Sequence, residues 1–190
     1  MIKGLFFDLD GTLLLTDKAN YIAYRDALEE FNLELTPEAF KKVNGKDSRD
    51  FLKSIFPKLT EQQVNKIRSD KAKRYLDLFG LVEANTPVIE ILKANQDKIT
   101  AIVTNAKSLG TYAILDYFEL SDKVTKVLTG DLVSRGKPSS EIYFRALKEC
   151  ELNCNEVIAF EDSNEGVISA RGAGIAVIKV PKFKNLDCQS

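Results

Sequence analysis

The sequence predicts an α/β fold, in which a doubly wound, mostly parallel sheet carries an inserted small α-helical domain. From residue 85 onward, short β-branched runs alternate with segments of helical periodicity, which is the pattern of βαβ units. Between residues 17 and 79, the periodic segments are helical and none alternates as a strand does. We therefore expect a core domain formed by residues 1–15 and 85–190, with residues 16–84 as the helical domain.

The core domain opens with a short apolar run over residues 2–8, which ends at Asp8 and suits a buried strand. Further strands are expected at residues 99–104, 126–129, 157–160 and 175–178. Helices are expected at residues 86–92, 107–117, 140–149 and 165–171. Helices would cover both faces of the sheet, and the crossover connections should be right-handed.

The inserted segment reads as a series of helices. Residues 17–32 place their apolar side chains on one helical stripe. Thr36 and Pro37 have the spacing of an N-cap followed by a first-turn proline. A third helix is expected to end before Pro57, and residues 60–63 resemble a capping box that starts a long helix reaching residue 79.

Composition limits the function. The chain has 190 residues, 44% of them hydrophobic, with 27 Lys and Arg against 28 Asp and Glu. Near-neutral charge argues against a nucleic-acid or membrane-surface partner, and no segment approaches the roughly 18 apolar residues of a membrane span. We expect a cytoplasmic protein, a monomer or weak homodimer, that acts on a small molecule.

The absence of histidine excludes several chemistries. Ser-His and Cys-His catalytic pairs, histidine-containing zinc motifs and histidine-ligated haem all require it. The three cysteines are an odd number and too few for a zinc site without histidine, so we interpret them as reduced thiols. Acid, base and nucleophile must therefore come from carboxylates, lysine, arginine, hydroxyls or thiols.

Polar residues follow the ends of three expected strands, and a lysine precedes a helix nearby. Ligands of open α/β sheets bind beyond the carboxyl ends of the strands. The residues concerned are Asp8, Asp10, Thr104, Asn105, Lys137, Glu161 and Asp162. Clustered carboxylates with no soft ligand suit Mg²⁺, and a lysine and hydroxyl beside them suit phosphoryl transfer. One aspartate would be the nucleophile and its neighbour would handle the proton.

Each of these residues also has an ordinary structural interpretation. Asp8 and Asp10 could be turn residues, and Thr104 and Asn105 could simply end a strand. Lys137 could be a solvated loop charge. Glu161 and Asp162 could interact favourably with a helix N-terminus. The occurrence of all four groups at strand ends or before a helix favours the chemical interpretation.

The four motifs also resemble a known family. They are Asp8-Leu9-Asp10-Gly11-Thr12, Thr104-Asn105, Gly136-Lys137-Pro138 and Glu161-Asp162-Ser163-Asn164-Glu165-Gly166. In this order they resemble the motifs of the haloacid dehalogenase (HAD) superfamily, whose core is a Rossmann-like sheet. The inserted helices resemble the small cap of the phosphoglycolate phosphatase and β-phosphoglucomutase branch. The resemblance implies a Mg²⁺-dependent phosphatase that acts on a small phosphorylated metabolite.

The resemblance also implies roles for individual residues. Asp8 would be the nucleophile and a metal ligand, and Asp10 the general acid and base, with its backbone carbonyl on the metal. Thr104 and Asn105 would hold phosphoryl oxygens, Lys137 would stabilise the nucleophile and the phosphoryl group, and Asp162 with Glu161 would hold Mg²⁺. In the helical domain, Lys46 and Arg49 would bind substrate, and Lys71 lies near a position that some members use in the same way.

Other activities are distinguishable by sequence. A phosphosugar mutase is the alternative enzyme, although Asn20 stands near where that branch usually has a histidine. A dehalogenase would not need the metal ligands. A non-enzymatic phospho-binding module, such as a response regulator, shares the acidic pocket. In a response regulator, however, the acidic pair and the phospho-accepting aspartate lie on different strands, with no helical insertion after the first strand.

Overall fold

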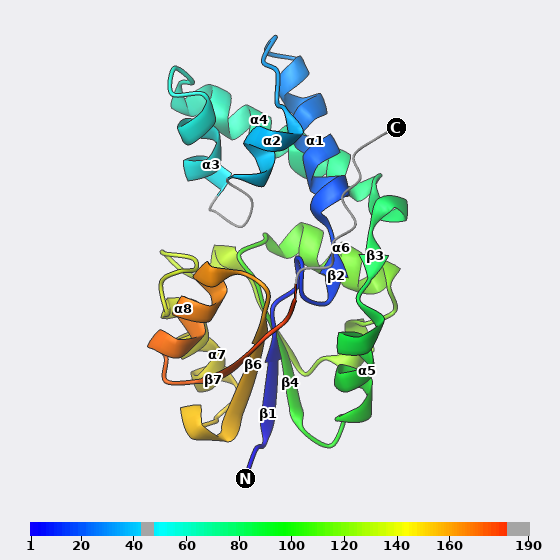
Figure 1. Ribbon diagram of the computed structural model, residues 1–190, viewed down its shortest axis with the longest axis vertical. Helices are drawn as coiled ribbons and strands as arrows, with labels where there is room; N and C mark the ends of the chain where they lie inside the picture. Colours follow the sequence, from blue (N-terminus) through cyan, green and yellow to red (C-terminus); the bar gives the residue numbers. More distant parts are fainter. Residues whose placement is uncertain (43–47, 182–190) are drawn as a thin grey trace. The chain divides into compact units, whose positions relative to one another are not determined.

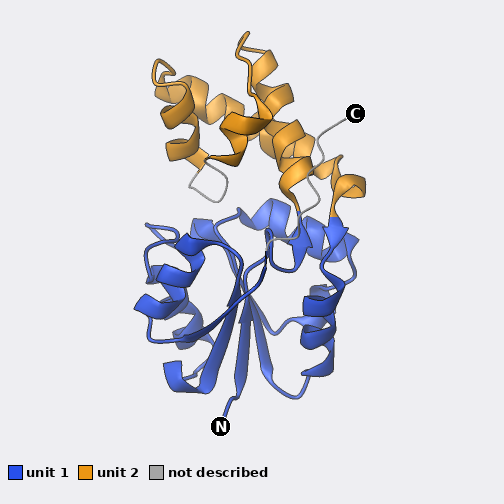
Figure 2. Cartoon of the chain, in the orientation of Figure 1, with its two compact units in different colours: residues 1–15, 83–183 blue, residues 16–82, 184–190 orange. Residues whose placement is uncertain are grey.

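The computed structural model describes residues 1–42 and 48–181 of the chain. The chain forms two compact units (Figure 2). The first comprises Met1–Leu15 and Glu83–Phe183, and the second contains Thr16–Val82. The second unit thus interrupts the first shortly after its first strand.

The first unit is built on a five-stranded parallel sheet of order β5-β4-β1-β6-β7. Its strands are β1 (Gly4–Phe7), β4 (Ile99–Val103), β5 (Lys126–Leu128), β6 (Val157–Glu161) and β7 (Ala176–Lys179). The five strands expected from the sequence are therefore confirmed. The strand that opens the chain lies at the centre, where both of its edges are paired and both of its faces are buried.

Helices cover both faces of this sheet, which confirms the doubly wound arrangement. They are α5 (Thr86–Ala94), α6 (Ser108–Tyr117), α7 (Glu141–Glu149) and α8 (Asn164–Gly172), with short 3₁₀ turns η2 (Ser121–Lys123), η3 (Gly130–Leu132) and η4 (Cys154–Glu156). The chain runs outward through β4 and β5, then returns to β6 and β7. Because crossovers are right-handed, this reversal puts α5 and α6 on one face and α7 and α8 on the other. Figure 1 shows α5 on the opposite side of the strands from α7 and α8.

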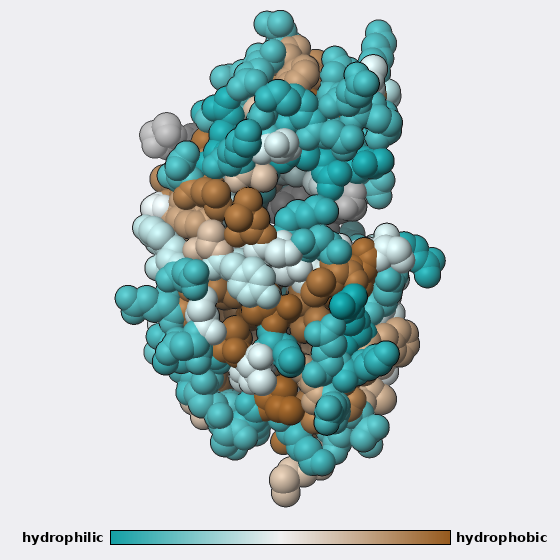
Figure 3. All heavy atoms as spheres, turned by 180° about the vertical axis from the view of Figure 1, so that it is seen from behind, coloured by the Kyte–Doolittle hydropathy of each residue, from teal (hydrophilic) through white to brown (hydrophobic). Residues whose placement is uncertain are grey.

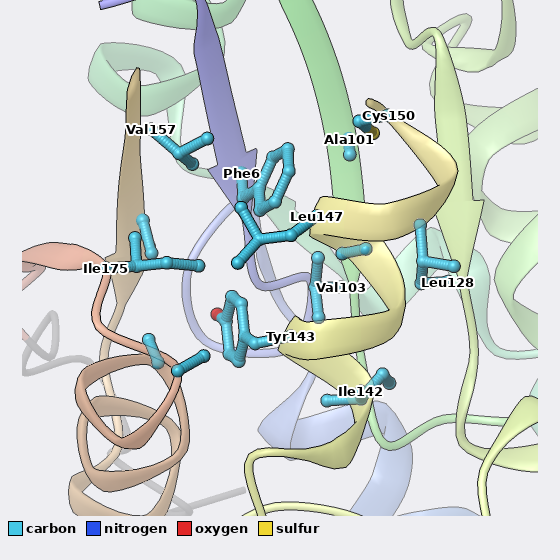
Figure 4. Close-up of a cluster of buried hydrophobic side chains, with 14 residues drawn as sticks. Phe6, Ala101, Val103, Leu128, Ile142, Tyr143, Leu147, Cys150, Val157 and Ile175 are labelled. Carbon is cyan, nitrogen blue, oxygen red and sulfur yellow. The ribbon is translucent and has the colours of Figure 1, made fainter. Parts of the chain in front are cut away.

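The core between the sheet and helices α7 and α8 is a continuous apolar cluster (Figure 4). Phe6 of β1 and Val103 of β4 face this cluster. The residues next to them along each strand face the other side of the sheet, because side chains alternate along a strand. Ile142, Tyr143 and Ala146 of α7 cover Phe6 and Val103, and all five residues have 0% exposure. This packing fixes α7 against the strands that carry the polar residues at their ends.

A two-stranded antiparallel ribbon, absent from the sequence prediction, joins β2 (Leu14–Leu15) to β3 (Glu83–Ala84). Each strand has two residues, too few to show any periodicity. Next to the ribbon, the buried side chain of Asn85 donates a hydrogen bond to the carbonyl of Thr12 (2.7 Å), and its main-chain N–H donates to that of Leu13 (2.9 Å). The segment that returns to the first unit is thereby bound to the loop that follows β1.

The second unit is helical throughout its described residues, as expected. It consists of α1 (Asp17–Glu29), α2 (Pro37–Lys41), α3 (Ser48–Ile55), α4 (Glu61–Leu76) and the 3₁₀ turn η1 (Phe79–Leu81). The capping box is present, because Thr60 and Gln63 exchange side-chain and main-chain hydrogen bonds. Leu28, Leu52 and Ile67 form the centre of its apolar core.

Some large apolar side chains remain exposed. Leu109, Tyr112 and Phe144 are 66%, 51% and 55% exposed, and Figure 3 shows one face of the molecule on which apolar side chains gather. Among the described residues, no helix is long and apolar enough to cross a bilayer.

Replacing Phe6 by alanine should lower the free energy of unfolding by about 3–5 kcal/mol, because a fully buried aromatic ring leaves a cavity. Urea denaturation measures this difference. The matched control is Phe144→Ala, which removes the same ring from an exposed position and should change stability by no more than about 0.5 kcal/mol. Equal losses in both variants would contradict the packing described for β1.

Candidate active site

The polar residues of three motifs meet at the carboxyl edge of the sheet, because the strands that carry them are neighbours. β1 lies between β4 and β6, and Asp8, Thr104 and Glu161 follow or end these strands. Strand pairing continues just past β1, where the main-chain N–H of Asp8 donates to the carbonyl of Phe160 (3.0 Å). The predicted juxtaposition of the first, second and fourth motifs is therefore present in the fold.

Lys137, from the third motif, lies at the centre of this group with a side chain only 4% exposed. Its ammonium donates to Oδ1 of Asp8 (2.7 Å), Oε1 of Glu161 (2.5 Å) and the carbonyl of Val103 (2.7 Å). These three acceptors match the three donors of a lysine ammonium. The side chain is thus held in one place, with its charge directed between two carboxylates.

Burial and charge oppose each other at this site. Burial raises the pKa of Asp8, although the nearby Lys137 ammonium acts to lower it. Burial likewise raises the pKa of Glu161 to about 7, with Lys137 lowering it and Asp8 raising it. Burial acts to lower the pKa of Lys137, but the two carboxylates outweigh it and the pKa is raised. The lysine is therefore firmly charged, while both carboxylates are harder to ionise than usual because one ammonium does not offset their burial and mutual repulsion.

Asn105 holds the loop that presents Lys137. Its side-chain Oδ1 accepts from the main-chain N–H of Lys137 (2.8 Å), and its Nδ2 donates to the Lys137 carbonyl (3.2 Å). Gly136 permits this close approach, since a Cβ there would lie 2.6 Å from the same Oδ1. The peptide bond between Lys137 and Pro138 is cis. The side chain of Asn105, expected to hold phosphoryl oxygens, is thus engaged with the backbone of the lysine loop.

Asp162 lies against the loop that follows β1. Gly11 has φ +89°, and a Cβ at this position would come within 2.5 Å of Oδ2 of Asp162. Only glycine combines this left-handed conformation with the space that the carboxylate occupies. The first motif therefore needs Gly11 to bring the carboxylates of the first and fourth motifs together.

The Glu161 carboxylate is accommodated at the start of α8. Ser163 caps this helix by accepting from the N–H of Gly166 (3.0 Å), and a Cβ on Gly166 would lie 1.7 Å from Oε2 of Glu161. Oε2 is buried and has no hydrogen-bond partner. A buried carboxylate oxygen without a partner is unfavourable unless a cation satisfies it.

Asp8, Glu161 and Asp162 form a potential metal site among the described residues, with one carboxylate oxygen from each within 4.8 Å of the others. The donor set is oxygen only, which suits a hard cation such as Mg²⁺. The unpartnered Oε2 and the excess of carboxylates over ammonium groups both fit a divalent cation here.

The other two expected residues lie beside this cluster. Asp10 is half-exposed, pairs with Leu14 in an isolated β-bridge, and is close enough for its charge to act on Asp8. Thr104 is 1% exposed, and its hydroxyl accepts from the main-chain N–H of Ala106 (3.0 Å).

The residues expected to bind substrate in the second unit are described only in part. Lys46 lies outside the described residues. Arg49 pairs with Glu61 (3.0 Å) within this unit. Lys71 donates to Oδ1 of Asn20 (2.6 Å), and its ammonium lies 4.3 Å from the ring centroid of Tyr75. These contacts assign no substrate.

The sequence did not indicate Tyr143. It lies on α7, six residues after Lys137, and its hydroxyl donates to Oε1 of Glu161 (2.5 Å). Its place in the helix expected over residues 140–149 gave no indication of a polar role. A tyrosine on a buried face needs a partner for its hydroxyl, and this requirement was the available signal.

The fold and the site define a class: a doubly wound α/β protein with a buried aspartate, a lysine and an acidic oxygen cluster at the switch point of its sheet. Residues 5–180 match the family described as haloacid dehalogenase-like hydrolase. The chain belongs to this family, and it is a hydrolase.

Relatives agree with this membership. The chain is 26% identical over 179 residues to a protein of Thermotoga maritima named phosphorylated carbohydrates phosphatase, covering 92% of this chain and 82% of the relative. Two solved structures, each 21% identical, share the fold. They are CbbY from Rhodobacter sphaeroides in complex with phosphate (TM-score 0.88, covering 98% of this chain and 89% of the other) and β-phosphoglucomutase from Clostridium difficile (TM-score 0.83, covering 98% and 87%).

Gly166→Ala tests whether the Glu161 carboxylate needs the space at the start of α8. Helix propensity alone would make alanine more stable by up to about 1 kcal/mol. We expect the opposite sign, because the new Cβ overlaps Oε2 of Glu161. Urea denaturation with and without Mg²⁺ should show lower stability and a smaller gain from Mg²⁺.

The control for this prediction is Gly110→Ala, which exchanges a half-exposed glycine within α6. Its stabilisation by Mg²⁺ should equal that of the wild type. A Gly166→Ala variant that is more stable than the wild type, with an unchanged Mg²⁺ response, would refute the steric argument.

Proposed function

We propose that this protein is a Mg²⁺-dependent phosphatase that hydrolyses a small phosphomonoester through an aspartyl-phosphate on Asp8. The observation that carries the proposal is the buried Lys137 ammonium, which bonds Asp8 and Glu161 at once. A cation fixed beside a carboxylate orients a nucleophile and balances charge on a phosphoryl group.

In the first step, a carboxylate oxygen of Asp8 forms a bond to phosphorus while the bond from phosphorus to the ester oxygen breaks. Asp10 donates a proton to the departing oxygen, so that an alcohol leaves. Lys137 stabilises negative charge on the phosphoryl oxygens, and the hydroxyl of Thr104 helps to hold them.

In the second step, a water oxygen bonds to phosphorus and the bond to Asp8 breaks, which releases inorganic phosphate. Asp10, now ionised, takes the proton from the water. Asp10 suits both roles because it is partly exposed and lies beside the buried Asp8.

Asp8, Asp162 and Glu161, with the backbone carbonyl of Asp10, would hold the Mg²⁺ ion. When bound, the ion supplies positive charge to the phosphoryl oxygens and balances the carboxylates.

We further propose that the substrate is a phosphorylated carbohydrate, since the Thermotoga maritima relative carries that name. The helical unit, residues 16–82, would act as the cap that selects it. Arg49 and Lys46 are the candidates for contacts with its distal groups.

Asp8→Asn should abolish phosphate release from an aryl phosphate or a sugar phosphate in Mg²⁺, because an amide cannot form the acyl phosphate. A phosphate assay measures activity, and thermal denaturation checks the fold. Asp97→Asn, at an exposed position, is the control and should retain full activity. An Asp8→Asn variant that keeps wild-type turnover would exclude the mechanism.

Removal of the metal distinguishes phosphatase activity from dehalogenase activity. Excess EDTA should reduce phosphate release to background, and added Mg²⁺ should restore it, because phosphatase activity requires the cation in the acidic cluster. A dehalogenase would act on a 2-haloacid in EDTA. Measurable halide release under those conditions, with no phosphate release in Mg²⁺, would contradict the proposed function.

A further inference from the structure

Tyr143 is buried among apolar residues yet directs its hydroxyl at the candidate active site. Its exposure is 0%, and Figure 4 shows its ring in the cluster beneath α7 with Val103 and Ile142 around it. The hydroxyl donates to Oε1 of Glu161 at 2.5 Å. The apolar face of α7 thus carries a polar contact that packing alone does not require.

This contact determines how the Glu161 carboxylate can turn. Oε1 accepts from both Tyr143 and Lys137, which uses both of its lone pairs. Oε2 is consequently the oxygen left without a partner, although it is buried. A rotation of the carboxylate out of this orientation would weaken both the charge-assisted bond from Lys137 and the bond from Tyr143.

The same side chain also touches the lysine. The Lys137 ammonium lies 5.4 Å from the centroid of the Tyr143 ring, within the range of a cation–π interaction. Tyr143 thus contacts both Glu161 and Lys137. Of these two residues, Asp8 is hydrogen-bonded to Lys137.

We propose that Tyr143 is a positioning residue of the cation site: it holds the Glu161 carboxylate so that Oε2 stays available to the cation. This proposal rests on the cation of the proposed function. Groups that hydrogen-bond a metal ligand typically change metal affinity about 10–100-fold when removed. A residue with a purely structural role would change stability and leave the affinity unaltered.

The test is Tyr143→Phe, which keeps the ring and removes the hydroxyl. Mn²⁺ serves as the probe, and titration followed by the electron paramagnetic resonance signal of free Mn²⁺ gives the Kd for Mn²⁺. Competition with Mg²⁺ then gives the Kd for Mg²⁺. We expect both Kd values to rise about tenfold. At saturating Mg²⁺, the KM for the phosphate ester should stay within twofold of the wild-type value, and activity should require higher Mg²⁺ concentrations.

Tyr112→Phe is the matched control, since it removes a hydroxyl from a tyrosine that is 51% exposed on α6 of the same unit. Its Mn²⁺ Kd should equal that of the wild type. Tyr143→Met, which lacks both hydroxyl and ring, provides a second variant if the phenylalanine variant does not fold, and should bind Mn²⁺ at least as weakly.

Two results would overturn the proposal: a Tyr143→Phe protein with a lower melting temperature but an unchanged Mn²⁺ Kd, or a wild-type protein that binds no Mn²⁺. Failure of the proposed function gives a different result. A wild-type protein that binds Mn²⁺ but releases no phosphate from any ester would refute the phosphatase, while the Kd ratio would still decide the role of Tyr143.

Discussion

The buried ammonium of Lys137 is the interaction on which the site depends. It joins the end of β1, the end of β4 and the last residue of β6 through Asp8, Val103 and Glu161. A buried ion pair gives little net stability, because desolvation offsets most of the attraction, but loss of one partner is strongly unfavourable. The network therefore contributes a defined position for the Asp8 carboxylate more than it contributes to folding.

The surrounding fold brings these residues together without steric clashes. The reversal of strand order brings three strand ends together, and the loops there approach one another closely only because certain side chains are missing. Gly11 leaves space for Asp162, and Gly166 leaves space for Glu161. Tyr143, which lies in the apolar core, donates a hydrogen bond to Glu161. The site is thus continuous with the packing of α7, so core and site residues cannot be fully separated.

Much of the architecture could be predicted because it follows from local patterns. Five strands, the helices between them and the helical insertion appear in the structure where periodicity placed them. The capping box at Thr60 is likewise present, because its hydrogen bonds join residues three apart. The ribbon of Leu14–Leu15 and Glu83–Ala84 was not predicted, because two-residue strands have no period and their partners lie far apart in sequence.

By itself, the sequence limited the chemistry available: with no histidine, acid, base and nucleophile must come from other side chains, and four motifs, three at strand ends and one before a helix, predicted the carboxylates and the lysine. Only the tertiary structure determined which of these groups are hydrogen-bonded to one another. In the structure, Lys137 bonds both Asp8 and Glu161, Asn105 bonds the backbone of the lysine loop, and the Tyr143 hydroxyl donates to Glu161. Such contacts depend on distances between distant segments, which hydrophobic periodicity and motif spacing do not encode.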